Sequence, residues 1–154
     1  MGNRANVVFV SGDVISPAVY LHWNGGPESV YAFLAEMDFR GIRTSDPAYE
    51  AARFTQIVGE FMDKDGFETT SVGITNGPSE LTTEGMEAVF TDAGDNGFYV
   101  TDRAEGTMRR WTGFKLEEWQ ADMVAEEKAR AEAHDYASGI AEAFREMAPG
   151  KRPR

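Results

Sequence analysis

Residues 6–23 read NVVFVSGDVISPAVYLHW, and this segment contains two runs of β-branched and aromatic residues. The first run is Asn6–Val10 and the second is Ala18–Trp23, and both have the composition of β-strands. The residues between them, SGDVISP, are rich in the turn formers Ser, Gly, Asp and Pro. The segment therefore predicts two strands joined as an antiparallel hairpin.

Two amphipathic helices are predicted directly after this hairpin. The first begins at Pro27, because proline suits the first position of a helix, and it stops before Gly41. The second begins after Asp46, which can act as an N-cap before Pro47, and it ends near Gly66. Apolar residues recur at helical spacing and predict a buried stripe on each helix: Val30, Phe33, Leu34 and Met37 on the first, and Phe54, Ile57, Val58, Phe61 and Met62 on the second.

Strands are predicted again in the second half of the chain. Val72 and Ile74 alternate with small or polar residues before an Asn-Gly-Pro turn, and this pattern predicts a third strand. Residues 88–91 and 98–101 flank a turn rich in Gly, Asp and Asn, so they predict a second hairpin. Residues 107–112 predict one more strand.

The segment Leu116–Met147 is rich in Ala, Glu, Lys and Arg and predicts a helix of about 30 residues, roughly 45 Å long. Because a domain of this size is narrower than that, the helix either breaks near residues 134–139 or packs on something else, for which we expect a second copy of the chain, in a homodimer. The predicted fold class is α+β, with an antiparallel or mixed sheet of about five strands and helices on one face. We expect residues 1–148 to form this single domain and residues 149–154 to form a flexible basic tail.

The residue types exclude several kinds of chemistry. The 154 residues include no cysteine and two histidines, His22 and His134. This excludes disulfides, thiolate nucleophiles and zinc–cysteine sites, and no metal-binding motif is built on the histidines, so we expect no metal and no cofactor. No apolar run approaches the roughly 20 residues that span a bilayer, and no signal-peptide pattern begins the chain. We therefore expect a cytoplasmic protein that does not bind membranes.

Charge is the property that says most about the partners of this chain. The formal net charge is −11 at pH 7, and residues 1–102 hold 16 of the 26 acidic residues but only 5 of the 15 Lys and Arg. Such a chain repels nucleic acid and anionic lipid and attracts proteins with a basic nucleic-acid-binding surface, although acidity also serves solubility alone. The carboxylates that we expect to contact a partner are Glu60, Asp63, Asp65, Glu68, Asp92, Asp95 and Asp102.

The turn between the second strand and the first helix is a second candidate site. The residues that would bind a ligand there are His22, Asn24, Gly25, Gly26 and Ser29. Backbone N–H groups at a helix N-terminus attract anions, and His22 could act as a general acid or base. Against this, the proline that begins the helix removes a donor, and the glutamate after it adds negative charge. The structural alternative is that Asn-Gly-Gly supplies positive φ values for a tight turn, and we assign no catalytic residue.

The N-terminal part of the chain resembles a known group of proteins. The strings that carry the resemblance are GNRANVVF at residues 2–9 and VYLHWNGGPESVYAFL at residues 19–34. They resemble uncharacterised small acidic proteins of bacterial plasmids, prophages and related mobile elements. The resemblance supplies no activity and no catalytic residue, but it implies a role against host defence or in gene expression.

Charge and resemblance together predict a non-enzymatic accessory protein of a mobile element. It would bind and inhibit a host nucleic-acid-processing or defence protein through its acidic surface, as anti-CRISPR or anti-restriction proteins do, without contacting nucleic acid itself. Two alternatives stay open. One is a small enzyme or ligand-binding domain that uses the turn from His22 to Ser29 as an anion site. The other is a structural protein that self-associates through Leu116–Met147.

Overall fold

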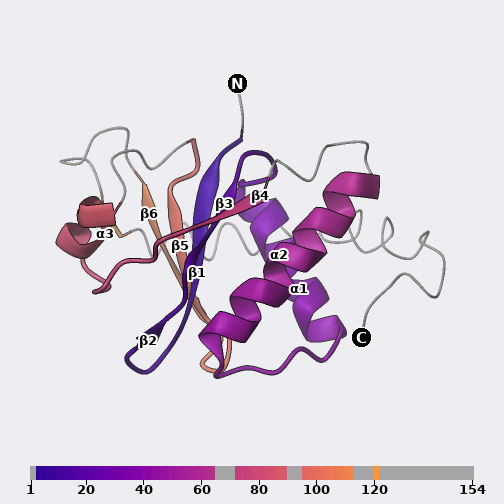
Figure 1. Cartoon of the computed structure of the whole chain (residues 1–154), viewed down its shortest axis with the longest axis horizontal. Helices are drawn as coiled ribbons and strands as arrows, with labels where there is room; N and C mark the ends of the chain where they lie inside the picture. The colour runs from indigo at the N-terminus through magenta and orange to yellow at the C-terminus, as the bar shows by residue number, and fades with distance from the viewer. Residues whose placement is uncertain (1–2, 65–71, 90–94, 113–119, 122–154) are drawn as a thin grey trace.

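The computed structural model of the chain describes residues 3–64, 72–89, 95–112 and 120–121 (Figure 1). These residues form an α+β fold with a mixed sheet. In chain order the elements are β1 (Ala5–Ser11), β2 (Val14–Ile15), β3 (Ala18–Leu21), α1 (Pro27–Phe39), α2 (Pro47–Lys64), β4 (Val72–Thr75), α3 (Thr83–Val89), β5 (Phe98–Asp102), β6 (Thr107–Thr112) and β7 (Gln120–Ala121). The strand order is β4-β3-β1-β5-β6-β7, and β2 pairs with β1 beside this row.

β1 lies inside the sheet because it has a partner on each side. It pairs antiparallel with β3, where Val7 lies opposite Val19, and parallel with β5, where Val7 lies opposite Tyr99. The predicted N-terminal hairpin is therefore confirmed. Two details differ from the prediction: Val14–Ile15, expected within the turn, form β2, and β3 ends before His22.

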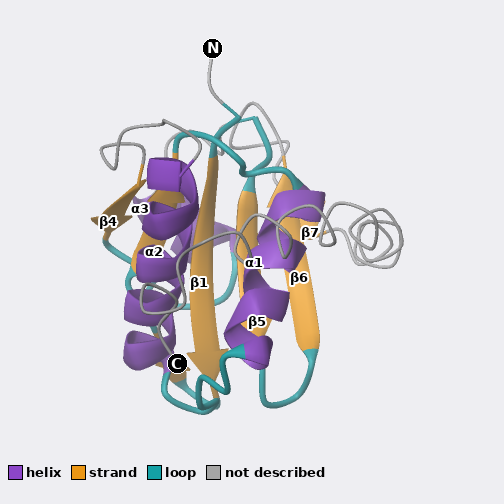
Figure 2. Cartoon of the chain, turned by 90° about the vertical axis from the view of Figure 1, so that its right-hand side faces the viewer, coloured by secondary structure: helices purple, strands orange, loops and turns teal. Residues whose placement is uncertain are grey.

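The sheet separates two apolar clusters. On one face, Val7 and Phe9 of β1 pack with the predicted stripes of α1 and α2, whose members are at most 8% exposed, except that the side chain of Met62 lies outside the described part of the chain. On the other face, Val8 packs with Met86 of α3. Figures 1 and 2 show α1 and α2 on one side of the sheet, and Figure 1 shows α3 on the other. The expectation that the helices cover one face is wrong, because the continuous apolar run of β1 alternates between two buried faces.

The predicted boundaries are confirmed for α1 and for the start of α2. Pro27 and Pro47 are the first residues of these helices. Asp46 caps α2, because its Oδ1 accepts a hydrogen bond from the N–H of Tyr49 at 3.4 Å. Gly41 follows the end of α1 with a φ of 68°, a value that glycine adopts without strain.

The strand predicted over residues 88–91 is wrong where the structure describes it, because α3 extends to Val89. Thr82 begins this helix: its Oγ1 accepts a hydrogen bond from the N–H of Gly85 at 3.0 Å, and its carbonyl O accepts one from the N–H of Met86 at 3.0 Å. Met86 is fully buried. A threonine cap and one buried anchor therefore outweigh the strand propensity of the residues that follow.

The predicted strands over residues 98–101 and 107–112 are confirmed as β5 and β6, which pair antiparallel. Beyond them, Gln120 and Ala121 form β7 on β6, so the helix predicted from Leu116 to Met147 is wrong at these two residues, where strand pairing outweighs helix propensity. The rest of that helix with its proposed dimer contact, the end of the second helix near Gly66 and the tail 149–154 all lie outside the described residues.

Candidate functional site

The turn between β3 and α1 is bonded to the start of β1. The N–H of Gly25 donates to the carbonyl O of Asn3 at 2.8 Å, and the Tyr99 hydroxyl donates to the carbonyl O of Gly25 at 2.9 Å. Burial raises the pKa of Tyr99, so its hydroxyl stays protonated. A Cβ atom at Gly25 would lie 2.6 Å from the Asn3 carbonyl O and 2.9 Å from the N of Ala5. Glycine is required here by close backbone approach, since the positive φ of this turn, 58°, belongs to Asn24.

The side chains around this turn also contact one another. Nδ1 of His22 lies 2.9 Å from the Tyr20 hydroxyl, and its ring meets that of Trp23 edge to face with centroids 5.2 Å apart. Ser29 is only 1% exposed, and within the described part of the chain its Oγ has no hydrogen-bond partner. The N–H of Gly25, which an anion site would use, already donates a hydrogen bond to the carbonyl O of Asn3. Use of this turn as an anion site therefore stays a prediction, and the geometry does not favour it.

Three of the acidic candidates have described side chains, and the structure does not bring them together. Glu60 pairs with Arg40 at 3.0 Å, and Asp95 pairs with Arg4 at 3.5 Å. The N–H of Arg4 also donates to Asp95 and lowers its pKa. Asp95 precedes β5, and Asp102 is the last residue of β5. Because this strand is about 17 Å long at 3.3 Å per residue, the two carboxylates lie far apart. The remaining candidates are the side chain of Asp63 and residues Asp65, Glu68 and Asp92, all outside the described part.

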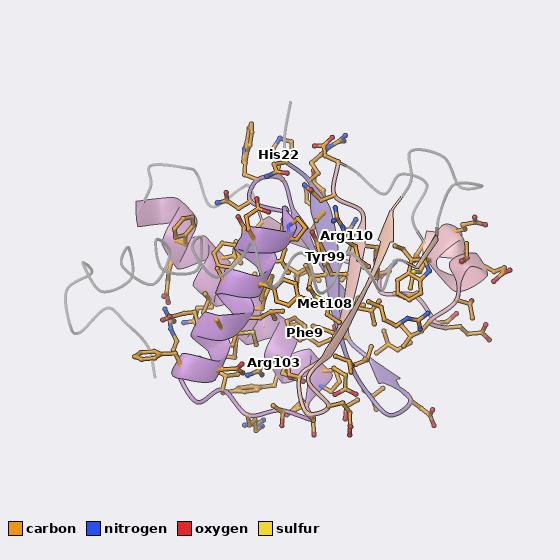
Figure 3. The ribbon with its side chains drawn as sticks, turned by 180° about the vertical axis from the view of Figure 1, so that it is seen from behind. Phe9, His22, Tyr99, Arg103, Met108 and Arg110 are labelled. Atoms are coloured by element: carbon orange, nitrogen blue, oxygen red, sulfur yellow. The ribbon has the colours of Figure 1, made fainter. Side chains whose placement is uncertain are left out.

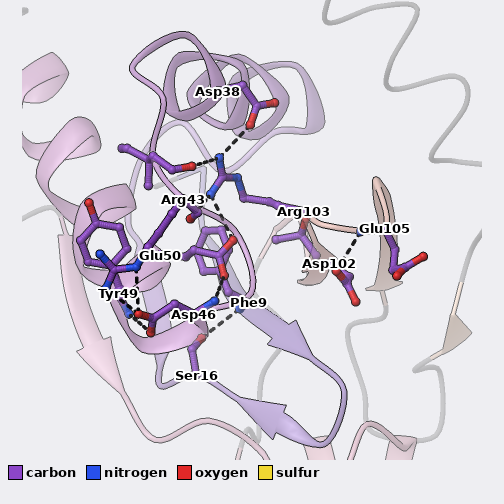
Figure 4. Close-up of polar contacts among 12 residues, drawn as sticks. Phe9, Ser16, Asp38, Arg43, Asp46, Tyr49, Glu50, Asp102, Arg103 and Glu105 are labelled. Atoms are coloured by element: carbon purple, nitrogen blue, oxygen red, sulfur yellow. Dashed lines mark hydrogen bonds and ion pairs between the residues drawn. The ribbon is translucent and has the colours of Figure 1, made fainter. Parts of the chain in front are cut away.

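A buried polar cluster forms around Arg103, in the turn between β5 and β6 (Figures 3 and 4). One terminal nitrogen donates to Oδ1 of Asp38 at 2.7 Å and to the carbonyl O of Ile42 at 3.0 Å. The other donates to Oε1 of Glu50 at 3.1 Å and to the carbonyl O of Arg43 at 3.2 Å. The cluster ties the β5–β6 turn to α1, to α2 and to the segment that connects them.

The ion pairs of this cluster place the cation inside and a carboxylate outside. The Arg103 side chain is 5% exposed, whereas that of Asp38 is 72% exposed. The pair of Arg40 and Glu60 is arranged in the same sense, at 2% and 20%. Glu50 is an exception: it is 1% exposed, and burial raises its pKa while the Arg103 guanidinium opposes that shift. Glu36, the second partner of Arg40, is buried as well, so only Asp38 and Glu60 are the more exposed members of their pairs with these two arginines.

Several solvent-accessible carboxylates lie at one edge of the sheet. β1 and β5 are parallel neighbours, so the turns that follow them lie at the same edge. Asp13 comes from the first turn, Asp102 ends β5, and Glu105 comes from the second turn. Asp38 joins them through its pair with Arg103. We call Asp13, Asp38, Asp102 and Glu105 the acidic edge. Nearby, exposed Arg43 is neutralised by Asp46 at 2.7 Å, and this hydrogen bond lowers the pKa of Asp46.

A pocket of about 290 Å³ opens beside the acidic edge, between α1 and the β5–β6 hairpin. Leu34 and Met108, which line it, are at most 8% exposed, and Ala35 lines it closer to solvent. Asp38 of α1 and Asp102 at the end of β5 also line it. Figure 3 places this end of the molecule, marked by Arg103, far from His22.

Sequence reasoning missed the centre of this site. Arg103 and Glu50 are 53 residues apart, and no local pattern joins them. One signal was present: Glu50 lies four residues before Phe54, so it continues the apolar stripe of α2. A charged residue in such a stripe is rarely left buried without a partner. The position of Arg103 in a turn gave no comparable signal.

Neither the described residues nor comparisons with known proteins supply a further assignment. No helix in the described part of the chain is long and apolar enough to cross a membrane. Among the same residues, no group of three or more His, Asp or Glu side chains is placed to hold a metal ion. No protein-family model, no curated protein and no solved structure matches the chain.

Proposed function

We propose that this protein is a non-enzymatic accessory protein that binds a host nucleic-acid-processing or defence protein. In this proposal the acidic edge enters the basic cleft of the partner and excludes the nucleic acid that the cleft would otherwise hold. The observation that carries the proposal is the asymmetry of the Arg103–Asp38 pair, with side chains 5% and 72% exposed. The guanidinium is buried and shared between two carboxylates, Asp38 and Glu50, and of these Asp38 is the one that faces solvent.

Long-range electrostatics supports this kind of partner. With a formal net charge of −11, the chain attracts cationic clefts through the same field that steers nucleic acid toward them. The proposal also changes which carboxylates form the acidic surface expected from the sequence. Of the carboxylates expected there, Asp102 belongs to the acidic edge, and Asp13, Asp38 and Glu105 are added to it.

The part of the acidic edge formed by Asp38, Asp102 and Glu105 is also held in a fixed arrangement. The N–H of Glu105 donates to Oδ1 of Asp102 at 3.1 Å, which orders the β5–β6 turn. Arg103 anchors the same turn to α1 through Asp38. A preorganised charged surface loses less conformational entropy on binding than a mobile one, and this favours affinity for a rigid cleft.

The proposal is tested by capturing partners from a bacterial host lysate on the full-length protein and measuring the affinity of each purified partner. The test variant is Asp102→Asn/Glu105→Gln, because asparagine preserves the acceptor for the Glu105 N–H. The matched control is Glu84→Gln/Glu87→Gln on α3, which removes the same charge from the other face of the sheet.

We expect a partner with a basic nucleic-acid-binding surface, which duplex DNA or RNA displaces from this protein. The acidic-edge variant should weaken binding about tenfold and the control variant less than about twofold. The proposal fails if no such partner is recovered, if nucleic acid and this protein bind the partner together, or if both variants weaken binding equally.

A further inference from the structure

We infer that the pocket beside the acidic edge receives the side chain of one lysine or arginine of the partner protein. This inference rests on the proposed function and specifies how the basic partner is recognised. It is carried by the juxtaposition of apolar side chains with two carboxylates, one from α1 and one from the end of β5, in the lining of one small pocket.

The size and lining of the pocket suit a single long side chain. Its volume of about 290 Å³ lies at the lower end of the about 300–1,000 Å³ typical of small-molecule sites. Leu34, Ala35 and Met108 offer apolar contact to the methylene stem of such a side chain. Lysine and arginine commonly bury this stem against apolar surface while the charged head stays near polar groups or water.

The charges around the pocket favour a cation. Oδ1 of Asp38 accepts a hydrogen bond from Arg103, and Oδ1 of Asp102 accepts one from the N–H of Glu105. No described residue donates to Oδ2 of either carboxylate, so each has an acceptor to offer. The positive charge of Arg103 is already paired with the carboxylates of Asp38 and Glu50. The immediate surroundings therefore hold three carboxylates against one guanidinium.

Two further observations favour a peptide as the source of the cation. Arg103 lines the pocket, its side chain is 5% exposed, and its Nε–H has no acceptor among the described residues. A peptide brings carbonyl oxygens that can serve this donor once the lining adjusts, whereas a simple amine brings none. Phe39 is 72% exposed and follows Asp38 on α1, one turn after Ala35. An exposed aromatic beside a charged pocket is typical of the anchors of protein interfaces.

The experiment is an NMR titration of the full chain, observing the methyl groups of Leu34 and Met108. The probes are acetyl-Gly-Lys-Gly-amide, its arginine analogue, its norleucine analogue and spermidine. Norleucine keeps the stem of lysine but lacks the ammonium group, and spermidine supplies the charge without a peptide. We expect saturable shifts with the lysine or arginine peptide, and binding at least about tenfold weaker for norleucine and spermidine.

Two variants fill the pocket without changing its charge. They are Ala35→Trp on α1 and Thr107→Trp on β6, at exposed positions that line the pocket. The control is Ala52→Trp at an exposed position of α2 outside the pocket. Either filling variant should abolish the saturable shifts of the basic peptides and weaken the natural partner about tenfold, whereas the control should do neither.

The outcomes separate this inference from the proposed function. If the partner binds the filled variants as tightly as the wild type, with the acidic-edge effect intact, the pocket inference is wrong and the proposed function stands. If no basic partner is recovered but the basic peptides bind the pocket, the proposed function fails, and only the recognition of a basic side chain by the pocket stands. Tighter binding of spermidine than of the peptides, equal binding of norleucine, or no binding of any probe would each overturn the inference.

Discussion

The buried cluster around Arg103 makes a quantitative prediction about stability. Arg103→Met removes four hydrogen bonds and leaves Glu50, which is 1% exposed, without its cation. The bond to Asp38 counts little, because that carboxylate is 72% exposed and stays solvated. Removing one partner of a buried ion pair costs about 3–5 kcal/mol. We therefore expect a fall in unfolding free energy of about 4 kcal/mol, or about 10 °C in Tm.

Urea denaturation followed by circular dichroism measures this loss. The control is Arg109→Met, which removes an exposed arginine that stacks on Trp111 at 4.4 Å and should cost less than about 1 kcal/mol. In the double variant Arg103→Met/Glu50→Gln the buried charge is gone, so its loss should be smaller than the sum of the two single losses by more than about 1 kcal/mol. A loss at Arg103 as small as that at Arg109, or strict additivity, would refute the reasoning.

Three further predictions concern the turns and the buried carboxylate. Gly25→Ala should destabilise the protein by about 1–3 kcal/mol, because the added Cβ would meet backbone atoms. Gly59→Ala on α2, where nothing lies within 4 Å of the added Cβ, should stabilise the protein by about 0.5–1 kcal/mol. Urea denaturation of the two variants compares these effects. Thr82→Ala should cost about 1 kcal/mol and speed hydrogen exchange of the Gly85 amide, which loses its acceptor. Because burial raises the pKa of Glu50 in the folded state, this group binds its proton more tightly there than in the unfolded chain, so its contribution to stability rises as the pH falls from 7 toward about 4.3. Thermal denaturation across this range should show this rise in stability in the wild type and a smaller rise in Glu50→Gln.

Each of these predictions has a contradicting result. Equal shifts for the two glycine variants would mean that backbone crowding does not decide the β3–α1 turn. Unchanged exchange at Gly85 would mean that Thr82 does not cap α3. A pH dependence identical in the wild type and in the Glu50 variant would mean that this carboxyl titrates alike in both states.

The elements that could be predicted are those whose signals are local. The hairpin of β1 and β3, the proline starts of α1 and α2 and the strands β5 and β6 all follow from nearby residues. The second buried face could not be predicted in detail, because Met86 reaches it from a short helix whose cap competes with strand-forming residues. One signal was available: the uninterrupted apolar run Val7–Val10 is typical of a strand buried on both faces.

The candidate site is less accessible to sequence reasoning because its parts are far apart in the chain. Asp38 and Arg103 are separated by 65 residues, and the pocket between α1 and the hairpin exists only once the sheet has formed. Charge counting indicated an acidic surface, but it selected Glu60, whose side chain is only 20% exposed, and Asp95, which lies beyond the other end of β5. Composition therefore indicates the sign of the surface, and only the fold indicates which carboxylates remain available to a partner.

The central claim is that the acidic edge competes electrostatically for a basic cleft. The most direct measurement is the salt dependence of the Kd of the purified partner for the wild type, for Asp102→Asn/Glu105→Gln and for Glu84→Gln/Glu87→Gln. We predict that log Kd rises steeply with log salt for the wild type and for the α3 variant, and distinctly less steeply for the acidic-edge variant. Three parallel lines, or a wild-type affinity that salt does not change, would contradict the claim.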